Sequence, residues 1–495
     1  MSRSDDRRRV LLTGATGNWG RATLRALRER PEIAVRALVL PAEAAPGAAS
    51  RGEAAALRRA RARTLAAFAD MANLQVVRGD LTNPADVARA VEGVDLVLHL
   101  GALVSPRADE HPDLAWRTNV GGMRHLIDAI RARPDPGAVT LVGVGSATET
   151  GNRPEPVHWG RVGDPLRVSP FDEYGQTKVA AERLLVDSGL PRWVWLRQTG
   201  ILHPGVLTVR DPIVTHTPLD GTLEWVSDDD SARLLVAIAA GQAPPDLWGR
   251  VWNIGGGHDW RLTNWEFHLA AARALGAGDP SGWFQRNWFS TGNFHGHWFS
   301  DSDDLEAIVP FRRDSFEDFL TASVASLPRA AHGAGRVPPW LVKHAVMGPL
   351  TRRPRGTMHA VGHRDEAAIA AHFGSLAAWR AIGDWSSYVP ATPSRTPRLL
   401  DHGYDESVPP ERWSTPLYRQ AAAFRGGALL GEAATGDIAT PLRWRCAFGH
   451  EFSGSPRLVL AAGHWCPECV RHPSQYAAQA ERNAFLAQVE HAQRP

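Results

Sequence analysis

A tyrosine and a lysine four residues apart form the pair in this sequence with the clearest chemical potential. Tyr174 and Lys178 lie in YGQTK, within a segment predicted to be helical over 173–187. This spacing places both side chains on one helical face, and an ammonium beside a phenol favours the phenolate. The pair therefore predicts a tyrosine with a lowered pKa, suited to general acid–base catalysis. Ser146 follows a predicted strand at 139–144 and is expected to hydrogen-bond the substrate oxygen and stabilise its developing charge.

A glycine-rich turn near the N-terminus predicts a dinucleotide site. The stretch TGATGNWG joins a short apolar run at 10–12 to helix-like sequence from about residue 21. Gly14 allows a tight turn, Gly17 lets the backbone approach a pyrophosphate, and Gly20 lets the helix pack close to the strand. The helix N-terminus then offers N–H groups and a positive dipole end to the phosphates.

The elements that must position these residues alternate between strand-like and helix-like segments from residue 8 to about 200. Apolar runs predict strands at 10–12, 33–40, 74–78, 95–100, 139–144 and 193–196. Because these runs are continuous rather than alternating, they indicate a parallel sheet covered on both faces. After Gly200 the alternation of strand-like and helix-like segments becomes less regular. An aromatic segment at 283–299 is expected either to wall the active site or to pack against the C-terminal part of the chain.

All three cysteines of the chain lie close together near the C-terminus. WRCAFGHEF contributes Cys446 and His450, and HWCPEC contributes Cys466 and Cys469. Two pairs of Cys and His ligands separated by a loop are typical of a closed tetrahedral zinc site. His464 is an alternative fourth ligand. Because four protein ligands leave no position for a substrate water, the zinc is expected to be structural.

The motifs follow one another in an order that resembles the short-chain dehydrogenase/reductase family, in its extended, epimerase/dehydratase-like branch. The resemblance spans residues 8–325 and rests on TGATGNWG, GDL (79–81), HLGA (99–102), TNVGG (118–122), GSAT (145–148), YGQTK (174–178) and LRQTGIL (196–202). It implies a catalytic set of Ser146, Tyr174, Lys178 and Asn119. It also implies cofactor-binding residues Gly14, Thr16, Gly17, Asn18, Trp19, Gly20, Asp80, Leu81, Leu100, Gly101, Ala102, Tyr174 and Lys178.

The resemblance assigns particular roles to three of these residues. Lys178 is expected to reach the nicotinamide ribose, Asn119 to hold a water that links Lys178 to solvent, and Asp80 to lie near the adenine. The cofactor is expected to be NAD(P). ALVLPAE has no acid at the end of the second strand to bind both ribose hydroxyls, which slightly favours NADP.

The function predicted is that of an NAD(P)-dependent oxidoreductase. Hydride would pass between the nicotinamide and a carbonyl or alcohol carbon, with Tyr174 as general acid/base. The stretch after the strand at 193–196, which in nucleotide-sugar epimerases is long, is short here, so a small or apolar substrate is expected. Two alternatives stay open. One is a nucleotide-sugar epimerase or dehydratase with tightly bound NAD, and the other is a non-catalytic dinucleotide-binding scaffold.

The fold class expected is α/β, a Rossmann-type doubly wound parallel sheet with a smaller substrate subdomain and an α-rich C-terminal extension that ends in a small zinc module. The expected boundaries are 8–200 for the dinucleotide-binding domain, 201–325 for the substrate subdomain, 326–440 for an extension of unknown role and 441–475 for the zinc-binding module. One hypothesis is that the extension covers the active site.

Charge and composition bear on location and partners. The chain has 55 basic and 53 acidic residues and a net charge of +2, which gives no electrostatic argument for nucleic acid or membrane lipid as a partner. We expect a small-molecule substrate and a cytoplasmic protein, because neither a secretory signal nor an apolar span is recognisable. The resemblance implies a homodimer that pairs through the two long helices of the sheet domain.

Overall fold

The computed structural model describes residues 7–48, 50–208, 211–292, 295–328 and 334–493. Its centre is a seven-stranded sheet in the order β10-β7-β5-β4-β1-β2-β3, with every neighbouring pair parallel. These strands are β1 (Arg8–Thr13), β2 (Ile33–Val39), β3 (Leu74–Arg78), β4 (Leu96–His99), β5 (Thr140–Ser146), β7 (Trp193–Gln198) and β10 (Arg250–Ile254). The predicted doubly wound parallel sheet is therefore confirmed.

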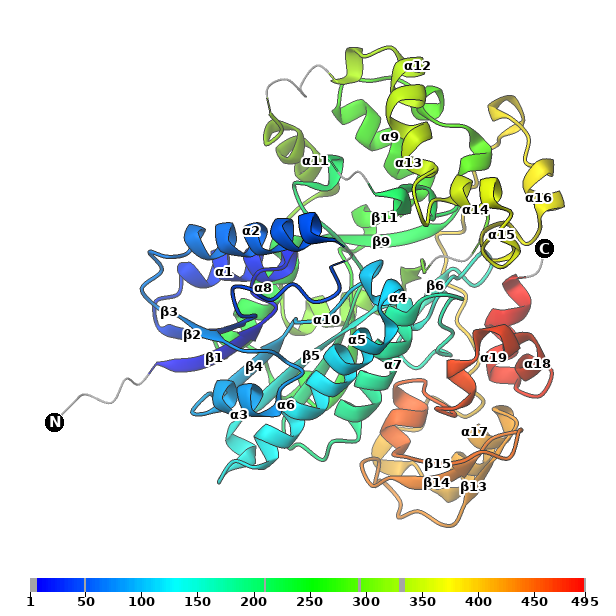
Figure 1. Cartoon of the computed structure of the whole chain (residues 1–495). Helices are drawn as coiled ribbons and strands as arrows, with labels where there is room; N and C mark the ends of the chain where they lie inside the picture. Colours follow the sequence, from blue (N-terminus) through cyan, green and yellow to red (C-terminus); the bar gives the residue numbers. More distant parts are fainter. Residues whose placement is uncertain (1–6, 49, 209–210, 293–294, 329–333, 494–495) are drawn as a thin grey trace.

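Helices cover both faces of this sheet (Figure 1). One layer contains α1 (Asn18–Arg28), α2 (Arg51–Ala67) and α8 (Asp228–Ala239), and the other contains α3 (Pro84–Val91), α6 (Gly122–Arg131) and α7 (Glu173–Val186). Successive residues of a strand face opposite sides, so Val10 and Leu12 pack in the first layer and Leu11 in the second. Within the described part of the chain, none of the helices combines the length and apolar character that a membrane span needs.

A smaller subdomain follows the sheet and carries a three-stranded sheet of β8 (Gly200–Leu202), β9 (Thr222–Ser227) and β11 (Arg261–Thr263). The predicted range of this subdomain, 201–325, stays a prediction. After β9 the chain returns to the large sheet, where α8 packs on α1 and β10 pairs with β7. Local sequence patterns show that α8 and β10 are a helix and a strand, but they do not show which sheet the two elements join.

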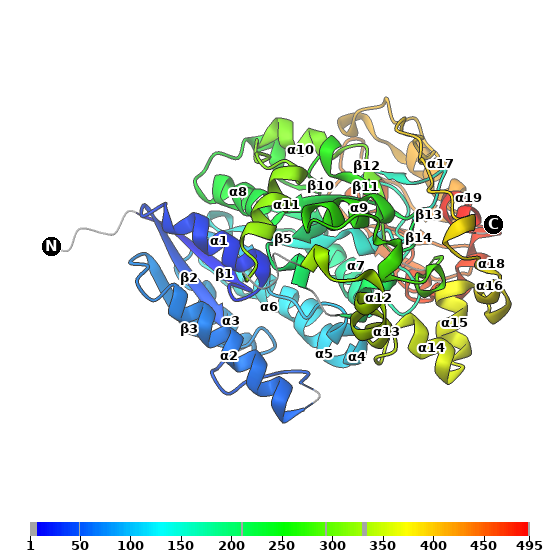
Figure 2. The same ribbon diagram turned by 90° about the horizontal axis from the view of Figure 1, so that it is seen from above.

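The aromatic segment 283–299 packs against the extension that follows it. Trp288 and Phe289 are buried in one cluster with Met347, Met358 and Trp385. Of the two expectations for this segment, packing against the C-terminal part is the one observed. The extension itself is a series of short helices, α12 (Pro339–Val342), α13 (Gly348–Thr351), α14 (Thr357–His363), α15 (Glu366–Phe373) and α16 (Leu376–Ala381), which lie on the far side of the molecule from β2 and β3 (Figure 2).

The final part of the chain forms a compact unit that we call the C-terminal module, residues 413–493. It contains α17 (Thr415–Phe424), a three-stranded antiparallel sheet of β13 (Ala428–Leu430), β14 (Leu442–Arg445) and β15 (Glu451–Gly454), and the helices α18 (Tyr476–Ala480) and α19 (Ala484–Glu490). The predicted start at residue 441 is too late, because β13 pairs with β14 and α17 supplies Tyr418 to the core around Trp444.

The C-terminal module packs on the outer face of α7. Arg183 on α7 donates to the carbonyl oxygens of Trp465 and Ser453, and Leu458 joins the apolar core between α7 and the sheet. In both ribbon views the module lies beside α7, away from β2 and β3 (Figures 1 and 2). The homodimer that the sequence predicts stays a prediction.

Candidate active site

A cavity of about 590 Å³ lies at the carboxyl ends of the central strands. Its lining brings together the predicted catalytic Ser146, Tyr174 and Lys178. It also contains every predicted cofactor-binding residue, namely Gly14, Thr16, Gly17, Asn18, Trp19, Gly20, Asp80, Leu81, Leu100, Gly101 and Ala102. Ligands of open α/β sheets bind at this edge, so the topology and the sequence motifs agree on one site.

The glycine turn has the geometry that a close backbone approach requires. Gly14 has φ +73°, and a Cβ there would lie 2.7 Å from the backbone N of Gly101. A Cβ on Gly20 would lie 2.7 Å from Cα of Ala15, so only glycine lets α1 pack against the turn. Gly17 is the N-cap of α1, and no side chain caps that helix. The N–H groups of the first turn of α1 are therefore available to an anion such as a pyrophosphate.

Ser146 ends β5 and is fixed by the turn that follows it. Its Oγ accepts from the N–H of Thr148 at 3.2 Å, and its own N–H donates to Glu149 Oε1 at 2.8 Å. This reciprocal capping box satisfies two backbone donors at the start of a short helical turn. The serine hydroxyl is thereby placed on the wall of the cavity, at the end of the strand.

Tyr174 and Lys178 reach the cavity from the first turns of α7. The helix starts at Asp172, whose carboxylate accepts from the N–H of Gly175 at 2.7 Å. Lys178 is buried, and its Nζ lies 5.5 Å from the centre of the Tyr174 ring. Burial lowers the pKa of Lys178 to about 8, although Glu149 opposes this shift.

The predicted lowering of the Tyr174 pKa is wrong for the structure described. Burial raises the pKa of Tyr174 well above 10, and the negative charges of Glu149 and Asp172 raise it further, whereas Ser146 opposes the shift. Lys178 lies over the ring face and directs its ammonium to the Val144 carbonyl oxygen, 2.7 Å away. The i,i+4 spacing predicts that Tyr174 and Lys178 lie together, but it does not predict that the carboxyl groups of Glu149 and Asp172 lie near Tyr174.

Asn119 lies behind the cavity rather than in its lining. It is buried in a wide helical turn at Trp116–Gly121. Its Nδ2 donates to the Leu103 carbonyl oxygen and to Thr177 Oγ1, both at 2.9 Å, and its Oδ1 accepts from the Leu103 N–H at 2.8 Å. These bonds tie the loop after β4 to α7. The expected water link from Asn119 to Lys178 stays a prediction.

Several residues of the cavity carried no signal in the sequence. Arg61 on α2 and Arg107 on α4 (Arg107–Glu110) line it, and so do the apolar Leu103, Val104, Leu114 and Ile201. Arg61 lies in an Ala- and Arg-rich helix that resembles an ordinary solvated face in the sequence. Only the packing of α2 across the end of β2 brings its guanidinium to the cavity.

Comparison with known proteins agrees with this site. The model of the NAD dependent epimerase/dehydratase family aligns with a segment that holds the glycine turn, Ser146, Tyr174 and Lys178. Residues 10–190 match this family. The family segment therefore includes the strands β1 to β5 and the helix α7 that build the cavity.

Individual relatives of the family segment are similar over short stretches. One is a D-erythronate dehydrogenase from Cupriavidus necator, 33% identical over 24% of this chain and 35% of the relative. Another is a mouse sterol-4-alpha-carboxylate 3-dehydrogenase, decarboxylating, 28% identical over 29% of this chain and 38% of the relative. The chain thus aligns with little more than a third of these curated relatives.

A solved structure shares the fold of about two thirds of the chain. It is a UDP-glucuronic acid 4-epimerase variant from Bacillus cereus in complex with NAD and a fluorinated UDP-sugar. The TM-score is 0.50 at 18% identity, over 64% of this chain and 97% of the epimerase.

Four potential metal ligands converge outside the family segment, in the C-terminal module. Ligand atoms of Cys446, His450, Cys466 and Cys469 all lie within 4.8 Å of one another. His450 Nδ1 is 3.4 to 3.5 Å from the three sulfur atoms, and Cys446 Sγ is 3.8 Å from Cys469 Sγ. Ligands around tetrahedral zinc, with Zn–S of about 2.3 Å and Zn–N of about 2.0 Å, are separated by similar distances of roughly 3.5–3.8 Å.

The turn that carries the first ligand pair lies between β14 and β15, and Gly449 in it has φ +82°. A left-handed residue at this point lets Cys446 and His450 face the same centre. The alternative ligand His464 points elsewhere, with its Nε2 2.9 Å from Glu182 Oε1 on α7. The set of Cys446, His450, Cys466 and Cys469 is therefore the one that the fold assembles.

Proposed function

We propose that the protein is an NAD(P)-dependent oxidoreductase that transfers hydride between a nicotinamide and a carbonyl or alcohol carbon. The observation that carries this proposal is the single cavity in which a glycine turn with free helix N–H groups meets Ser146, Tyr174 and Lys178. Each of these groups has a separate task in such a reaction, and the fold brings all of them to one edge of the sheet.

The side chains divide the proton chemistry between them. Ser146 donates a hydrogen bond to the substrate oxygen, and Tyr174 exchanges a proton with the same oxygen. Lys178, a cation below about pH 8, stabilises the phenolate that forms when Tyr174 loses its proton. The glycine turn and Asp80 would hold a nicotinamide dinucleotide, which would supply or accept the hydride. Because burial raises the pKa of Tyr174 above its usual value of 10, the phenol is protonated at neutral pH and is suited to protonating a carbonyl oxygen.

The cofactor proposed is NADP, on the basis of charge at the end of β2. No acid stands at the end of β2 to bind a ribose diol. Arg61 lines the cavity, and its guanidinium donates to the carbonyl oxygens of Ala42 and Ala44, which lie just after β2. A guanidinium matches the geometry and charge of a 2′-phosphate. NAD itself is bound in the Bacillus cereus epimerase structure, which makes NAD the alternative.

The substrate proposed is a small or apolar carbonyl compound. Four aliphatic side chains, Leu103, Val104, Leu114 and Ile201, lie in the cavity with Tyr174. The two curated relatives described above are named as dehydrogenases, which agrees with net oxidation or reduction. A nucleotide-sugar epimerase remains the second candidate, because a protein with that name shares the fold.

Consumption of reduced cofactor tests the proposal. Purified protein is incubated with NADPH or NADH and a panel of 3-keto acids, cyclic ketones and steroid ketones, and loss of nicotinamide absorbance is recorded. Net consumption that Tyr174→Phe abolishes supports an oxidoreductase. Cofactor that copurifies and is never consumed, together with interconversion of UDP-sugars, would favour the epimerase. If the protein neither consumes the cofactor nor interconverts UDP-sugars, the dinucleotide-binding scaffold is left as the function.

For the C-terminal module we propose a structural zinc ion on Cys446, His450, Cys466 and Cys469. The near-tetrahedral spacing of these four ligand atoms supports it. Since all four ligands come from protein, the ion would stabilise the module and would not bind substrate. Metal analysis of the purified protein, with one zinc expected per chain, tests this assignment.

A further inference from the structure

A continuous path of buried polar side chains joins the C-terminal module to Ser146. His464 Nε2 lies 2.9 Å from Glu182 Oε1. Arg197 donates to both oxygens of Glu182, from Nη2 at 2.7 Å and from Nε at 2.9 Å. The same Nε lies 3.4 Å from Glu149 Oε2, and Glu149 Oε1 accepts from the Ser146 N–H at 2.8 Å. Hydrogen bonds and ion pairs thus lead from residue 464 to the end of β5.

The side chains of this path are almost completely shielded from water. His464 is 2% exposed, Arg197 is 1% exposed, and Glu149 and Glu182 are fully buried. Arg197 keeps the pKa of Glu182 low, whereas burial and the charge of Glu182 raise the pKa of Glu149 well above its usual value. One guanidinium therefore faces the side chains of two buried glutamates. Removing any partner would leave a buried polar group unpaired, which costs several kcal/mol.

The module contacts this network at two points. Besides His464, the carbonyl oxygen of Ala462 accepts from Arg197 Nη2 at 2.7 Å. Glu182 lies on α7, one turn after Lys178, and Arg197 lies on β7 beside β5. Residues 462–464 thus complete the hydrogen bonding of a group on the helix of Tyr174 and of a group on the strand next to Ser146.

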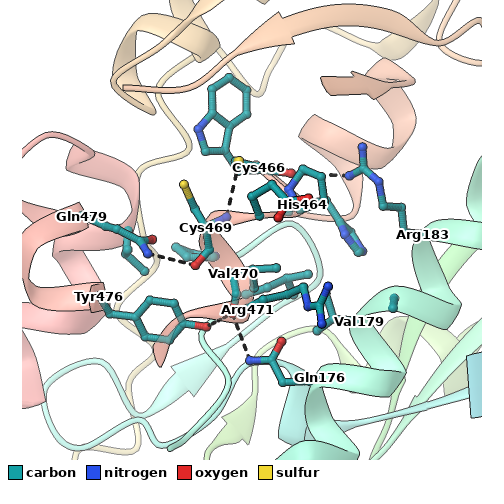
Figure 3. A pocket seen from close by; sticks show the side chains of 18 of the residues that line it. Gln176, Val179, Arg183, His464, Cys466, Cys469, Val470, Arg471, Tyr476 and Gln479 are labelled. Carbon is teal, nitrogen blue, oxygen red and sulfur yellow. Dashed lines mark hydrogen bonds between the residues drawn. The ribbon is translucent and has the colours of Figure 1, made fainter. Parts of the chain in front are cut away.

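A pocket of about 280 Å³ marks the seam between the module and α7 (Figure 3). His464 and Arg183 lie at this seam. At this interface between the module and α7, Gln176 donates to the Val470 carbonyl oxygen at 2.9 Å. Tyr476 donates to the same oxygen at 2.6 Å. Residues on both sides of Lys178 along α7 are therefore held by the C-terminal module.

We propose that His464 is a positioning residue, which acts through Glu182, Arg197 and Glu149 to hold Ser146 in its catalytic orientation. The C-terminal module is then required for turnover but not for dinucleotide binding. Among the described residues, no part of the module lines the cofactor cavity. This inference depends on the proposed function for its statement about turnover, whereas its statement about the orientation of Ser146 stands on the contacts alone.

The test uses the full-length, zinc-loaded protein with three substitutions. His464→Leu removes the contact to Glu182, His464→Gln retains a donor at the position of Nε2, and His472→Leu alters an exposed histidine of the same module. Hydrogen exchange of the segment 145–151, which holds Ser146 and Glu149, reports on the turn without any substrate. NADPH affinity, measured by fluorescence, reports separately on the glycine turn.

We expect His464→Leu to increase exchange in 145–151 at least tenfold while NADPH affinity changes less than threefold. His464→Gln is expected to restore most of the protection, and His472→Leu to leave it unchanged. With a substrate, His464→Leu is expected to lower kcat about tenfold at constant KM for NADPH. Equal exchange in His464→Leu and His472→Leu would overturn the proposal. A different outcome would count against the proposed function alone. In that outcome His464→Leu loses exchange protection in 145–151, but the unsubstituted protein turns over no substrate.

If His464→Leu does not fold, Glu149→Gln tests the same path from its other end. Coupling between two sites is reciprocal, so Glu149→Gln is expected to increase exchange in 458–466, where the His464 N–H donates to the Leu458 carbonyl oxygen. Unchanged exchange in 458–466, in a folded Glu149→Gln protein, would also overturn the proposal.

Discussion

Lys178 donates from Nζ to the carbonyl oxygen of Val144, 2.7 Å away and only two residues before Ser146. The ammonium is buried, and burial lowers its pKa to about 8 from 10.5. At neutral pH the folded protein therefore holds a buried charge, and the loss of its hydration lowers the free energy of unfolding. We predict that Lys178→Met stabilises the fold near pH 7 while it abolishes turnover.

The sign of the pH dependence follows from proton binding. Between about pH 8 and 10.5 the unfolded chain holds a proton on Lys178 that the folded chain has released, so the free energy of unfolding rises with pH through this window. The difference between 10.5 and about 8 corresponds to about 3 kcal/mol. The advantage of Lys178→Met in urea unfolding should accordingly shrink by about this amount between pH 7 and about pH 10.5. A constant difference would contradict the lowered pKa.

Tyr174→Phe removes the proposed proton donor and leaves the ring in place. We predict a loss in kcat of about 100- to 10,000-fold, the usual contribution of a general acid, with little change in NADPH affinity. Steady-state kinetics and cofactor fluorescence measure the two effects. Tyr388→Phe is the matched control, because its hydroxyl donates to Asp220 outside the cavity. Equal activities of the two variants would exclude the assigned role of Tyr174.

Cys469→Ser removes one of the four converging ligands. We predict that zinc falls from one ion per chain to a small fraction, and that the thermal midpoint falls by about 10 °C because metal binding energy stabilises the folded module. Mass spectrometry for zinc and thermal unfolding test this. His472→Leu, in the same module but outside the ligand set, should keep both the metal and the midpoint. Retention of zinc by Cys469→Ser would exclude the proposed ligand set.

Arg61→Ala tests the choice between the two dinucleotides. A guanidinium–phosphate contact contributes about 1.5–3 kcal/mol, so we predict that KM for NADPH rises at least tenfold and KM for NADH hardly changes. Arg59→Ala on the same helix is the control, since Arg59 is exposed and does not line the cavity. A parallel loss for both cofactors would show that Arg61 holds the loop of Ala42 and Ala44, to whose carbonyl oxygens it donates, rather than a phosphate.

The parts of the fold that local sequence predicts best are the strands of the large sheet and the helices between them. The expected strand at 74–78 is β3, and the expected helix at 173–187 is α7 to within one residue. Continuous apolar runs and turn glycines encode these elements locally. Contacts between distant segments have no such signal. β6 (Trp159–Gly160) pairs with β12 (Trp298–Phe299) across a long stretch of chain, and no local pattern indicates it.

The residues of the candidate site also fall into two groups, those that the sequence reveals and those that only the fold reveals. Ser146, Tyr174 and Lys178 could be found because their types and spacing carry the chemistry, and the ligand pairs could be found because they lie close in sequence. Glu149 and Arg197 could not, because each appears in the sequence as an ordinary polar residue and only burial makes it important. The wrong sign for the Tyr174 pKa has the same origin, since Glu149 approaches Tyr174 only in the fold.

The position of Ala462 and His464 near the end of the chain has a consequence for protein synthesis. Ser146 and Tyr174 are translated early, and domains begin to fold as they leave the ribosome. Glu182 and Arg197 nevertheless lack their last partners until residues 462–464 emerge. A message cut short before that point would yield a polypeptide with the dinucleotide-binding strands but an unfinished support for its catalytic serine. Synthesis past residue 464 is thus needed before the buried network behind Ser146 has all its partners.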